Sequence, residues 1–153
     1  MTQENKQLLL KDLCARLPYG VKVCYVTLPD SMPKAWDLIG MPAPHLADII
    51  VEGKYRFAAC DVEENIRPYL RPMSSMTEEE REEFRALILP EASCAYEDCL
   101  EWDAQIIGGG YLQISVEDFS KVVDWLNEHH FDYRGLIEKG LAIAVTDENN
   151  PYK

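Results

Sequence analysis

Three stretches of the chain place apolar residues every three or four positions, which is the period of an amphipathic helix. Helices are therefore expected near 4–17, 77–88 and 115–130. The apolar stripe is Leu9, Leu10, Leu13 and Leu17 in the first helix, Phe84, Leu87 and Ile88 in the second, and Phe119, Val122, Val123, Leu126 and His130 in the third. Pro18 and Gly20 are expected to end the first helix.

Runs of β-branched and aromatic residues predict strands between the helices. Such runs occupy 21–28, 47–51 and 55–60, and the last two are separated by the short polar link of a hairpin. The apolar stretches 106–114 and 141–145 are further candidate strands. A short additional helix is expected over Tyr133 to Lys139, closed by Gly140.

The order of these elements indicates an α+β fold, because strands and helices do not alternate strictly along the chain. We expect one globular domain over 1–153, in which a small, mostly antiparallel sheet is covered by about three helices. Four prolines interrupt 29–45, so this stretch is predicted to be a surface insertion loop anchored by Trp36, Leu38 and Ile39. The polar residues 146–153 are predicted to form a flexible tail.

The stretch from Arg67 to Phe84 reads RPYLRPMSSMTEEEREEF. Each proline biases the preceding residue, Arg67 or Arg71, towards extended backbone. A capping box then starts the helix, formed either by Ser75 with Glu78 or by Thr77 with Glu80. Glutamates in a first helical turn suit the positive end of the helix dipole. The pairs Glu78–Arg81 and Glu82–Arg85 are expected to form ion pairs along the helix.

Charge is distributed unevenly along the chain, whose formal net charge is −12. Residues 1–60 hold 7 basic and 6 acidic residues, whereas residues 61–153 hold 8 basic and 21 acidic residues. An acidic surface repels phosphate backbones and anionic lipid, so direct binding to nucleic acid or membrane is not expected. The charge fits a basic protein partner or a mimic of DNA, and its commonest role is simple solubility.

The five cysteines are scattered along the chain, and the first residues are polar rather than the apolar core of a signal peptide. No apolar run approaches the roughly 18 residues needed to span a bilayer. We therefore expect a reduced, cytoplasmic protein whose thiols are mostly buried.

No motif in the chain meets a catalytic or nucleotide-binding pattern. The triple glycine 108–110 lacks the Lys-Ser/Thr of a phosphate loop and is read as a turn. His129 and His130 are adjacent on a helix and point about 100° apart, which disfavours one shared ion. Cys94 and Cys99 have no second cysteine pair. No catalytic, cofactor or metal-binding residue is assigned, and metal binding by these two pairs stays open.

Arginines flank an aromatic residue at Arg67, Tyr69 and Arg71, a pattern that can bind nucleic acid. Because the surrounding sequence is acidic, a structural or protein-binding role is favoured. The residues assigned to a candidate interaction surface are Arg67, Tyr69, Arg71, Trp36, His129 and His130.

The segments DLCARLPYGVKV (12–23), IRPYLRPMSSMTEEEREEF (66–84) and VDWLNEHHFDYRGLIEKGLA (123–142) resemble an uncharacterised group of small bacterial proteins from prophages and other mobile elements. Together they cover about a third of the chain. The resemblance implies a phage or mobile-element origin and a location in the host cytoplasm. It carries over no catalytic residue, and the chain departs from the group between Tyr25 and Glu64 and at its last residues.

Three hypotheses about function follow. The first is a non-enzymatic accessory or regulatory protein that binds another protein, through the 29–45 loop or the acidic stretch 76–103. The second is an acidic DNA mimic that inhibits a host DNA-binding enzyme. The third is an enzyme with a Cys/His site. The first is preferred, with no cofactor and an unassigned oligomeric state.

Overall fold

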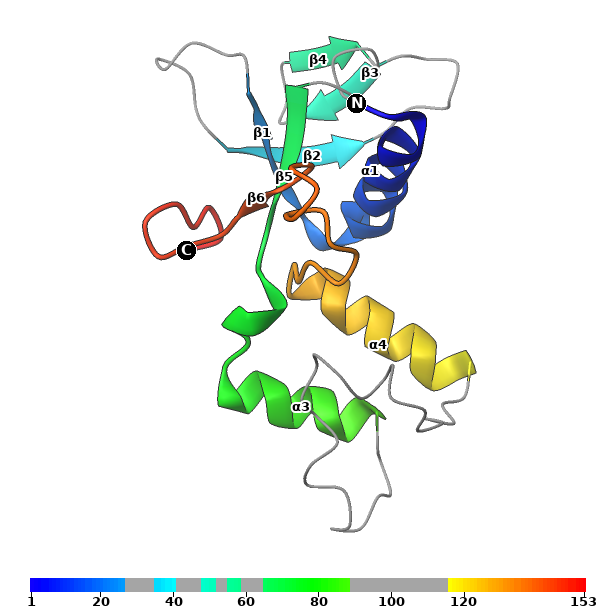
Figure 1. The fold of residues 1–153 in the computed structure, drawn as a ribbon, viewed down its shortest axis with the longest axis vertical. Helices are drawn as coiled ribbons and strands as arrows, with labels where there is room; N and C mark the ends of the chain where they lie inside the picture. Colours follow the sequence, from blue (N-terminus) through cyan, green and yellow to red (C-terminus); the bar gives the residue numbers. More distant parts are fainter. Residues whose placement is uncertain (27–34, 41–47, 52–54, 59–64, 89–115) are drawn as a thin grey trace. The chain divides into compact units, whose positions relative to one another are not determined.

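The computed structural model describes residues 1–26, 35–40, 48–51, 55–58, 65–88 and 116–153. Its elements, in chain order, are α1 (Gln3–Arg16), the 3-10 helix η1 (Leu17–Tyr19), β1 (Lys22–Tyr25), β2 (Trp36–Gly40), β3 (Asp48–Val51), β4 (Tyr55–Ala58), β5 (Ile66–Leu70), the 3-10 helix η2 (Met73–Ser75), α3 (Glu78–Ile88), α4 (Val116–Glu128) and β6 (Ile143–Ala144) (Figure 1). The chain divides into two compact units, one of Met1–Ser75 with Leu126–Lys153 and one of Met76–Trp125.

The first unit contains a sheet whose described strands follow the order β4-β3-β2-β1-β5-β6. Neighbouring strands are antiparallel except for β5 and β6, which are parallel. The predicted α+β class with a small, mostly antiparallel sheet is therefore confirmed. The hairpin predicted from 47–51 and 55–60 is present as β3 and β4, with Ile49 opposite Phe57. The candidate strand at 106–114 lies outside the described residues.

The core of the first unit forms where α1 packs against the sheet (Figure 1). Leu9 and Leu13 of α1 are completely buried, as is Val21 just before β1. The cluster is completed by Val23, Trp36, Leu38, Ile66, Leu70, Leu136 and Leu141. α1 begins at a side-chain cap, where Thr2 Oγ1 accepts from Asn5 N at 3.2 Å. As predicted, Pro18 and Gly20 end the helix, and Gly20 takes the left-handed backbone that suits glycine, with φ of 67°.

The stretch 29–45 contains a strand where the sequence predicted a loop. Residues 36–40 form β2, and Lys22 of β1 lies opposite Asp37. The loop prediction gave weight to the prolines on either side, and those prolines bound the strand without entering it. Trp36 is 7% exposed and Leu38 is 3% exposed, so neither presents an apolar surface to a partner.

β5 is a second strand that the sequence did not predict, because it contains Pro68, and proline is rare inside strands. The backbone explains why proline is tolerated here. Val145 N donates to Leu70 O, so Leu70, and therefore Pro68 two residues earlier, directs its backbone polar groups towards β6. β6 pairs only from Tyr69 onwards. The missing N–H of Pro68 thus removes no bond of the sheet.

The predicted helix over 133–139 is instead a series of turns fixed by one carboxylate. Asp132 Oδ1 accepts from Leu136 N at 2.8 Å, and Asp132 Oδ2 accepts from Ile137 N at 2.7 Å. Side-chain bonds of this kind compete with the backbone ladder of a helix. Gly140 closes the segment with φ of 67°, as the sequence suggested.

The second unit contains α3 and most of α4, close to the predicted ranges 77–88 and 115–130. Phe84 is 1% exposed, and its ring lies 5.3 Å from the ring of Trp125 at an angle of 56°. Of the two capping boxes that the sequence allowed, the structure contains the one at Thr77. Glu80 N donates to Thr77 Oγ1 at 3.2 Å, and Thr77 N donates to Glu80 Oε2 at 2.8 Å.

Candidate functional site

A buried ion pair lies on the core-facing side of α1. Asp12 and Arg16 are both fully buried, and Arg16 Nε donates to Asp12 Oδ2 at 2.8 Å. These residues occupy positions i+3 and i+7 from Leu9, so the buried stripe of α1 is half polar. The apolar period of α1 does not reveal this pair, because it marks only the leucines. In the sequence, the pair is indicated by an acidic and a basic residue that lie one helical turn apart on the same face as the leucines.

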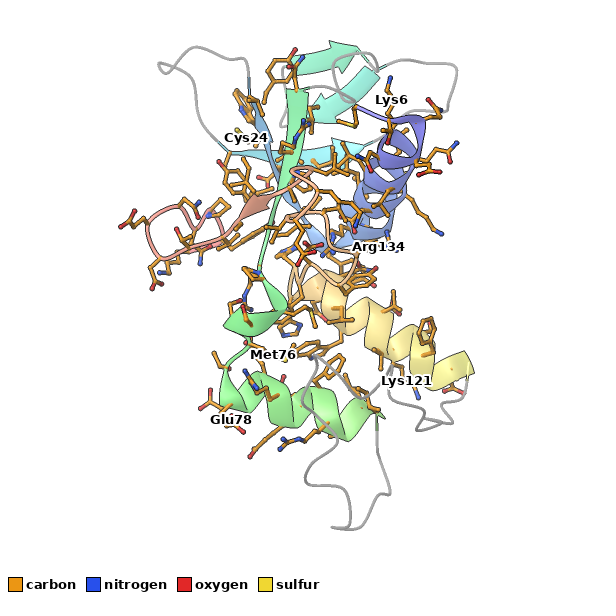
Figure 2. The ribbon with its side chains drawn as sticks, in the orientation of Figure 1. Lys6, Cys24, Met76, Glu78, Lys121 and Arg134 are labelled. Carbon is orange, nitrogen blue, oxygen red and sulfur yellow. The ribbon has the colours of Figure 1, made fainter. Side chains whose placement is uncertain are left out.

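The segment that follows α4 closes over this ion pair. Arg16 Nη2 donates to Phe131 O at 2.7 Å, and Arg134 Nη1 donates to Asp12 Oδ1 at 3.4 Å. The Tyr133 ring centroid lies 5.3 Å from the guanidinium carbon of Arg16 and 4.9 Å from that of Arg134. Figure 2 shows Arg134 beside the C-terminal end of α1. The buried charges are thus compensated by groups far apart in sequence, which gives the cluster a structural role.

Arg71 belongs to the same assembly. Its backbone N donates to His130 O and its O accepts from Asp132 N, both at 2.8 Å. Its guanidinium carbon lies 4.3 Å from the centroid of the buried Phe131 ring, and its Nη2 donates to Ser75 O at 3.3 Å. Arg71 is half-buried and makes several contacts within the chain, which is typical of a structural arginine.

The other arginine and the two aromatic residues of the predicted surface are also used internally. Arg67 Nε donates to Gly140 O at 2.9 Å, and Arg67 Nη1 donates to Ile66 O at 2.8 Å. Tyr69 is 6% exposed, and burial, together with the neighbouring Cys24, raises its pKa to about 12. Trp36 is part of the hydrophobic core described above.

The two histidines turn in different directions. The His130 ring is buried and stacks on the Tyr152 ring, with centroids 4.0 Å apart. The His129 ring is half-buried and stacks on Phe131 at 6.4 Å. Within the described ranges, no group of three or more His, Cys, Asp or Glu side chains could hold a metal ion. Cys94 and Cys99 lie outside those ranges.

Three of the six residues assigned to the candidate interaction surface therefore lie close together, and the other three lie elsewhere in the first unit. Arg71, His129 and His130 meet around Phe131 and Tyr152, whereas Arg67 lies against Gly140 and Trp36 lies in the core. Arg16, Arg71 and Phe131 come from the segments 12–23, 66–84 and 123–142, so parts of the chain far apart in sequence meet in this assembly.

The largest group of exposed carboxylates in the described part of the second unit lies on α3. Glu78, Glu79, Glu82 and Glu83 are exposed, and Figure 2 shows Glu78 at the first turn. We call these four residues the acidic face. At about 100° per residue they span an arc of about 140°, and the buried Phe84 lies almost diametrically opposite its centre.

The ion pairs predicted within α3 do not form. Arg81 Nε instead donates to Met76 O at 3.4 Å, which holds this arginine at the start of the helix. In the described part of the chain, no salt bridge neutralises the acidic face. By contrast, Lys121 of α4 pairs with Glu117 at 3.1 Å. The acidic face is therefore a patch of exposed negative charge on α3 that has no salt bridge within the described residues.

Comparison with protein-family models, curated proteins and solved structures gave no match to this chain. Among the helices that the structure describes, none combines the length and the apolar character needed to cross a bilayer.

Proposed function

We propose that the protein is a non-enzymatic accessory protein that binds a basic segment of another protein through the acidic face of α3. The observation that carries this proposal is the set of four exposed glutamates, which form no salt bridge with any described residue, on a helix whose opposite side is buried at Phe84. Arginine- and lysine-rich segments are complementary to such a surface, and charge complementarity speeds association and selects partners.

The arrangement of the glutamates supports binding more than solubility alone. Glu78 with Glu82 and Glu79 with Glu83 are like charges one turn apart, and such pairs destabilise a helix by a few tenths of a kcal/mol each. Solubility does not require charges at this spacing, because scattered carboxylates serve equally well. A partner's cations would remove the repulsion. The proposal also keeps the phage or mobile-element origin and the cytoplasmic location that the sequence resemblance implies.

Affinity capture with three forms of the full chain tests the proposal. The first is the natural protein. In the second, Glu78, Glu79, Glu82 and Glu83 become Gln while the capping residue Glu80 is kept. The third carries Glu4→Gln, Glu128→Gln, Glu138→Gln and Glu148→Gln, four exposed positions outside α3. Both variants change the net charge equally, so they separate a local surface from overall charge.

We expect a protein captured by the natural form to be retained by the scattered variant and lost by the α3 variant. Equal loss from both variants, or equal retention, would contradict a specific acidic face. Adding double-stranded DNA distinguishes the alternative of a DNA mimic, whose target would be released by DNA. The described acidic face spans only about 7.5 Å along the helix axis, about two nucleotide steps of one DNA strand, so it favours a short basic segment.

A further inference from the structure

The C-terminal segment ends in a contact that closes the sheet. The hydroxyl of Tyr152 accepts a hydrogen bond from Lys22 N at 3.1 Å and donates one to Tyr69 O at 2.8 Å. One hydroxyl thus joins β1 to β5. Within residues 146–153, which the sequence predicts to be a flexible tail, Tyr152 contacts the sheet and Lys153 is exposed.

The position of this hydroxyl in the sheet is specific. β1 and β5 pair Tyr25 with Ile66, Cys24 with Arg67 and Val23 with Pro68. The next pair in the same register is Lys22 with Tyr69, and the Tyr152 hydroxyl stands between them. A hydroxyl can donate one bond and accept others, so it replaces the direct N–H···O bond that would continue the ladder. The hydroxyl of Tyr152 is therefore inserted between the two strands at the end of the β1–β5 pair.

His130 supplies the surface against which Tyr152 is held. Their rings are nearly parallel, 13° apart. The backbone of His130 is fixed, because its N donates to Asn127 O and its O accepts from Arg71 N. It also takes a left-handed conformation, with φ of 58°. Because the histidine is anchored, separation of the two rings requires movement of the C-terminal segment.

Apart from those of the Tyr152 hydroxyl, the hydrogen bonds of residues 146–153 in the described structure are short-range, and most are exposed. Thr146 N and Tyr152 N donate to asparagine side chains within the segment, and Asn149 Nδ2 donates to Ala144 O. Lys153 pairs with Asp147 at 3.2 Å, both largely exposed. Exposed pairs contribute little to stability. Among the described hydrogen bonds of residues 146–153, those of the Tyr152 hydroxyl connect the segment to β1 and β5.

The charges around His130 oppose a second positive charge there. Arg16 faces it from α1, Arg71 from the residue after β5, and His129 is its neighbour in sequence. The nearby carboxylates are committed elsewhere: Asp12 to Arg16 and Arg134, and Asp132 to the N–H groups of Leu136 and Ile137. Within the described structure, Nδ1 of His130 is buried without a hydrogen-bond partner.

We propose that residues 146–153 form an acid-sensitive clasp, in which Tyr152 closes the β1–β5 ladder and is released when His130 becomes protonated. Release exposes the imidazolium to water and leaves Lys22 N and Tyr69 O to form hydrogen bonds with water. The clasp is independent of the acidic face of α3.

The direction of the pH effect follows from the pKa of His130. Burial first, and then the neighbouring cations, lower this pKa from 6.5 to about 4. Above pH 6.5 the ring is neutral whether the clasp is open or closed. Between pH 6.5 and 4 the exposed ring takes up a proton and the closed one does not, so acidification favours opening. The open fraction rises at most tenfold per pH unit, or roughly 300-fold over the whole interval.

Amide hydrogen exchange measured by NMR tests the clasp, because the Lys22 amide donates directly to Tyr152. Protection factors are compared between pH 7 and pH 4.5 for Lys22 and for Leu38, whose amide donates to Val21 O at 3.1 Å in the same unit. We expect Lys22 protection to fall with acidification while Leu38 protection stays constant. A constant Lys22 value, or a parallel fall at Leu38, would overturn the proposal.

Three variants make the test specific to the proposed contacts. His130→Asn keeps a residue type that tolerates positive φ and should make Lys22 protection independent of pH. His129→Gln should leave the pH dependence in place. Tyr152→Ala should abolish Lys22 protection at every pH and move the NMR titration midpoint of His130 from near 4 towards 6.5. A His130 midpoint near 6.5 in the natural protein would also refute the clasp, whether or not His130→Asn folds.

Discussion

The two compact units use charged side chains in opposite ways. In the first unit, Asp12 and Arg16 are fully buried and bonded to one another, Asp12 also accepts from Arg134, and Arg16 also donates to a backbone carbonyl. In the second, the glutamates of the acidic face stand in solvent without a salt bridge in the described structure. A charge enclosed by its own chain specifies how the chain packs. An exposed, uncompensated charge remains available to another molecule.

The largest expected effect is that of Arg16→Met, which leaves Asp12 as a buried charge with a weakened set of partners. The free energy of unfolding, measured by urea denaturation, should fall by about 3–5 kcal/mol. Adding Asp12→Leu should recover part of that loss, because the second change removes the uncompensated charge.

The matched control is Lys121→Met in the second unit. Lys121 and Glu117 also form an i,i+4 ion pair, but their side chains are 53% and 82% exposed. Removal of an exposed pair should cost at most about 0.5 kcal/mol. Similar losses for Arg16→Met and Lys121→Met would break the contrast between the two units.

An intermediate effect is expected at the start of α3. Thr77→Ala removes the acceptor of Glu80 N and opens the capping box, which should cost about 1 kcal/mol in urea denaturation. Ser75→Ala is the control, because Ser75 Oγ donates to Pro72 O and does not cap the helix. If the Ser75 variant were the more damaging of the two, the capping assignment would be wrong.

The smallest effect should have the opposite sign. The double change Glu82→Gln and Glu83→Gln removes both like-charge i,i+4 pairs and keeps the first-turn glutamates that favour the helix dipole. We expect a gain in stability of about 0.5 kcal/mol at low salt, and a smaller gain at 0.5 M NaCl because salt screens exposed charges. A loss of stability would show that Glu82 or Glu83 has a structural role and would weaken the case for a binding surface.

The candidate site was only partly accessible from sequence. Arg71 and His130 were identified as notable, yet their partners Phe131 and Tyr152 were not, since nothing local links an arginine before a proline to an aromatic residue 60 positions later. Asp12 and Arg16 escaped notice for a related reason. An i,i+4 acid–base pair reads as a solvent-exposed pair unless the burial of that helix face is known. The acidic face was easier to predict from sequence. A single phenylalanine among glutamates marks the buried side of the helix, so the glutamates on the opposite side are expected to face solvent.

The sequence alone determined much of the local structure, although not the turns at 133–139. Apolar periodicity located α1, α3 and α4, β-branched runs located β1, β3 and β4, and the Ser/Thr–Glu spacing at 75–80 restricted the cap of α3 to two candidates. These features depend on neighbours within about four residues, where side-chain period and backbone hydrogen bonding decide the outcome. Tertiary structure decided everything that depends on distant pairing. It made 36–40 and 66–70 strands, because their backbone groups find partners in β1, β3 and β6. It buried the ion pair of α1 beneath Phe131 and Tyr133, and it placed the hydroxyl of Tyr152 between two strands more than 80 residues away in sequence.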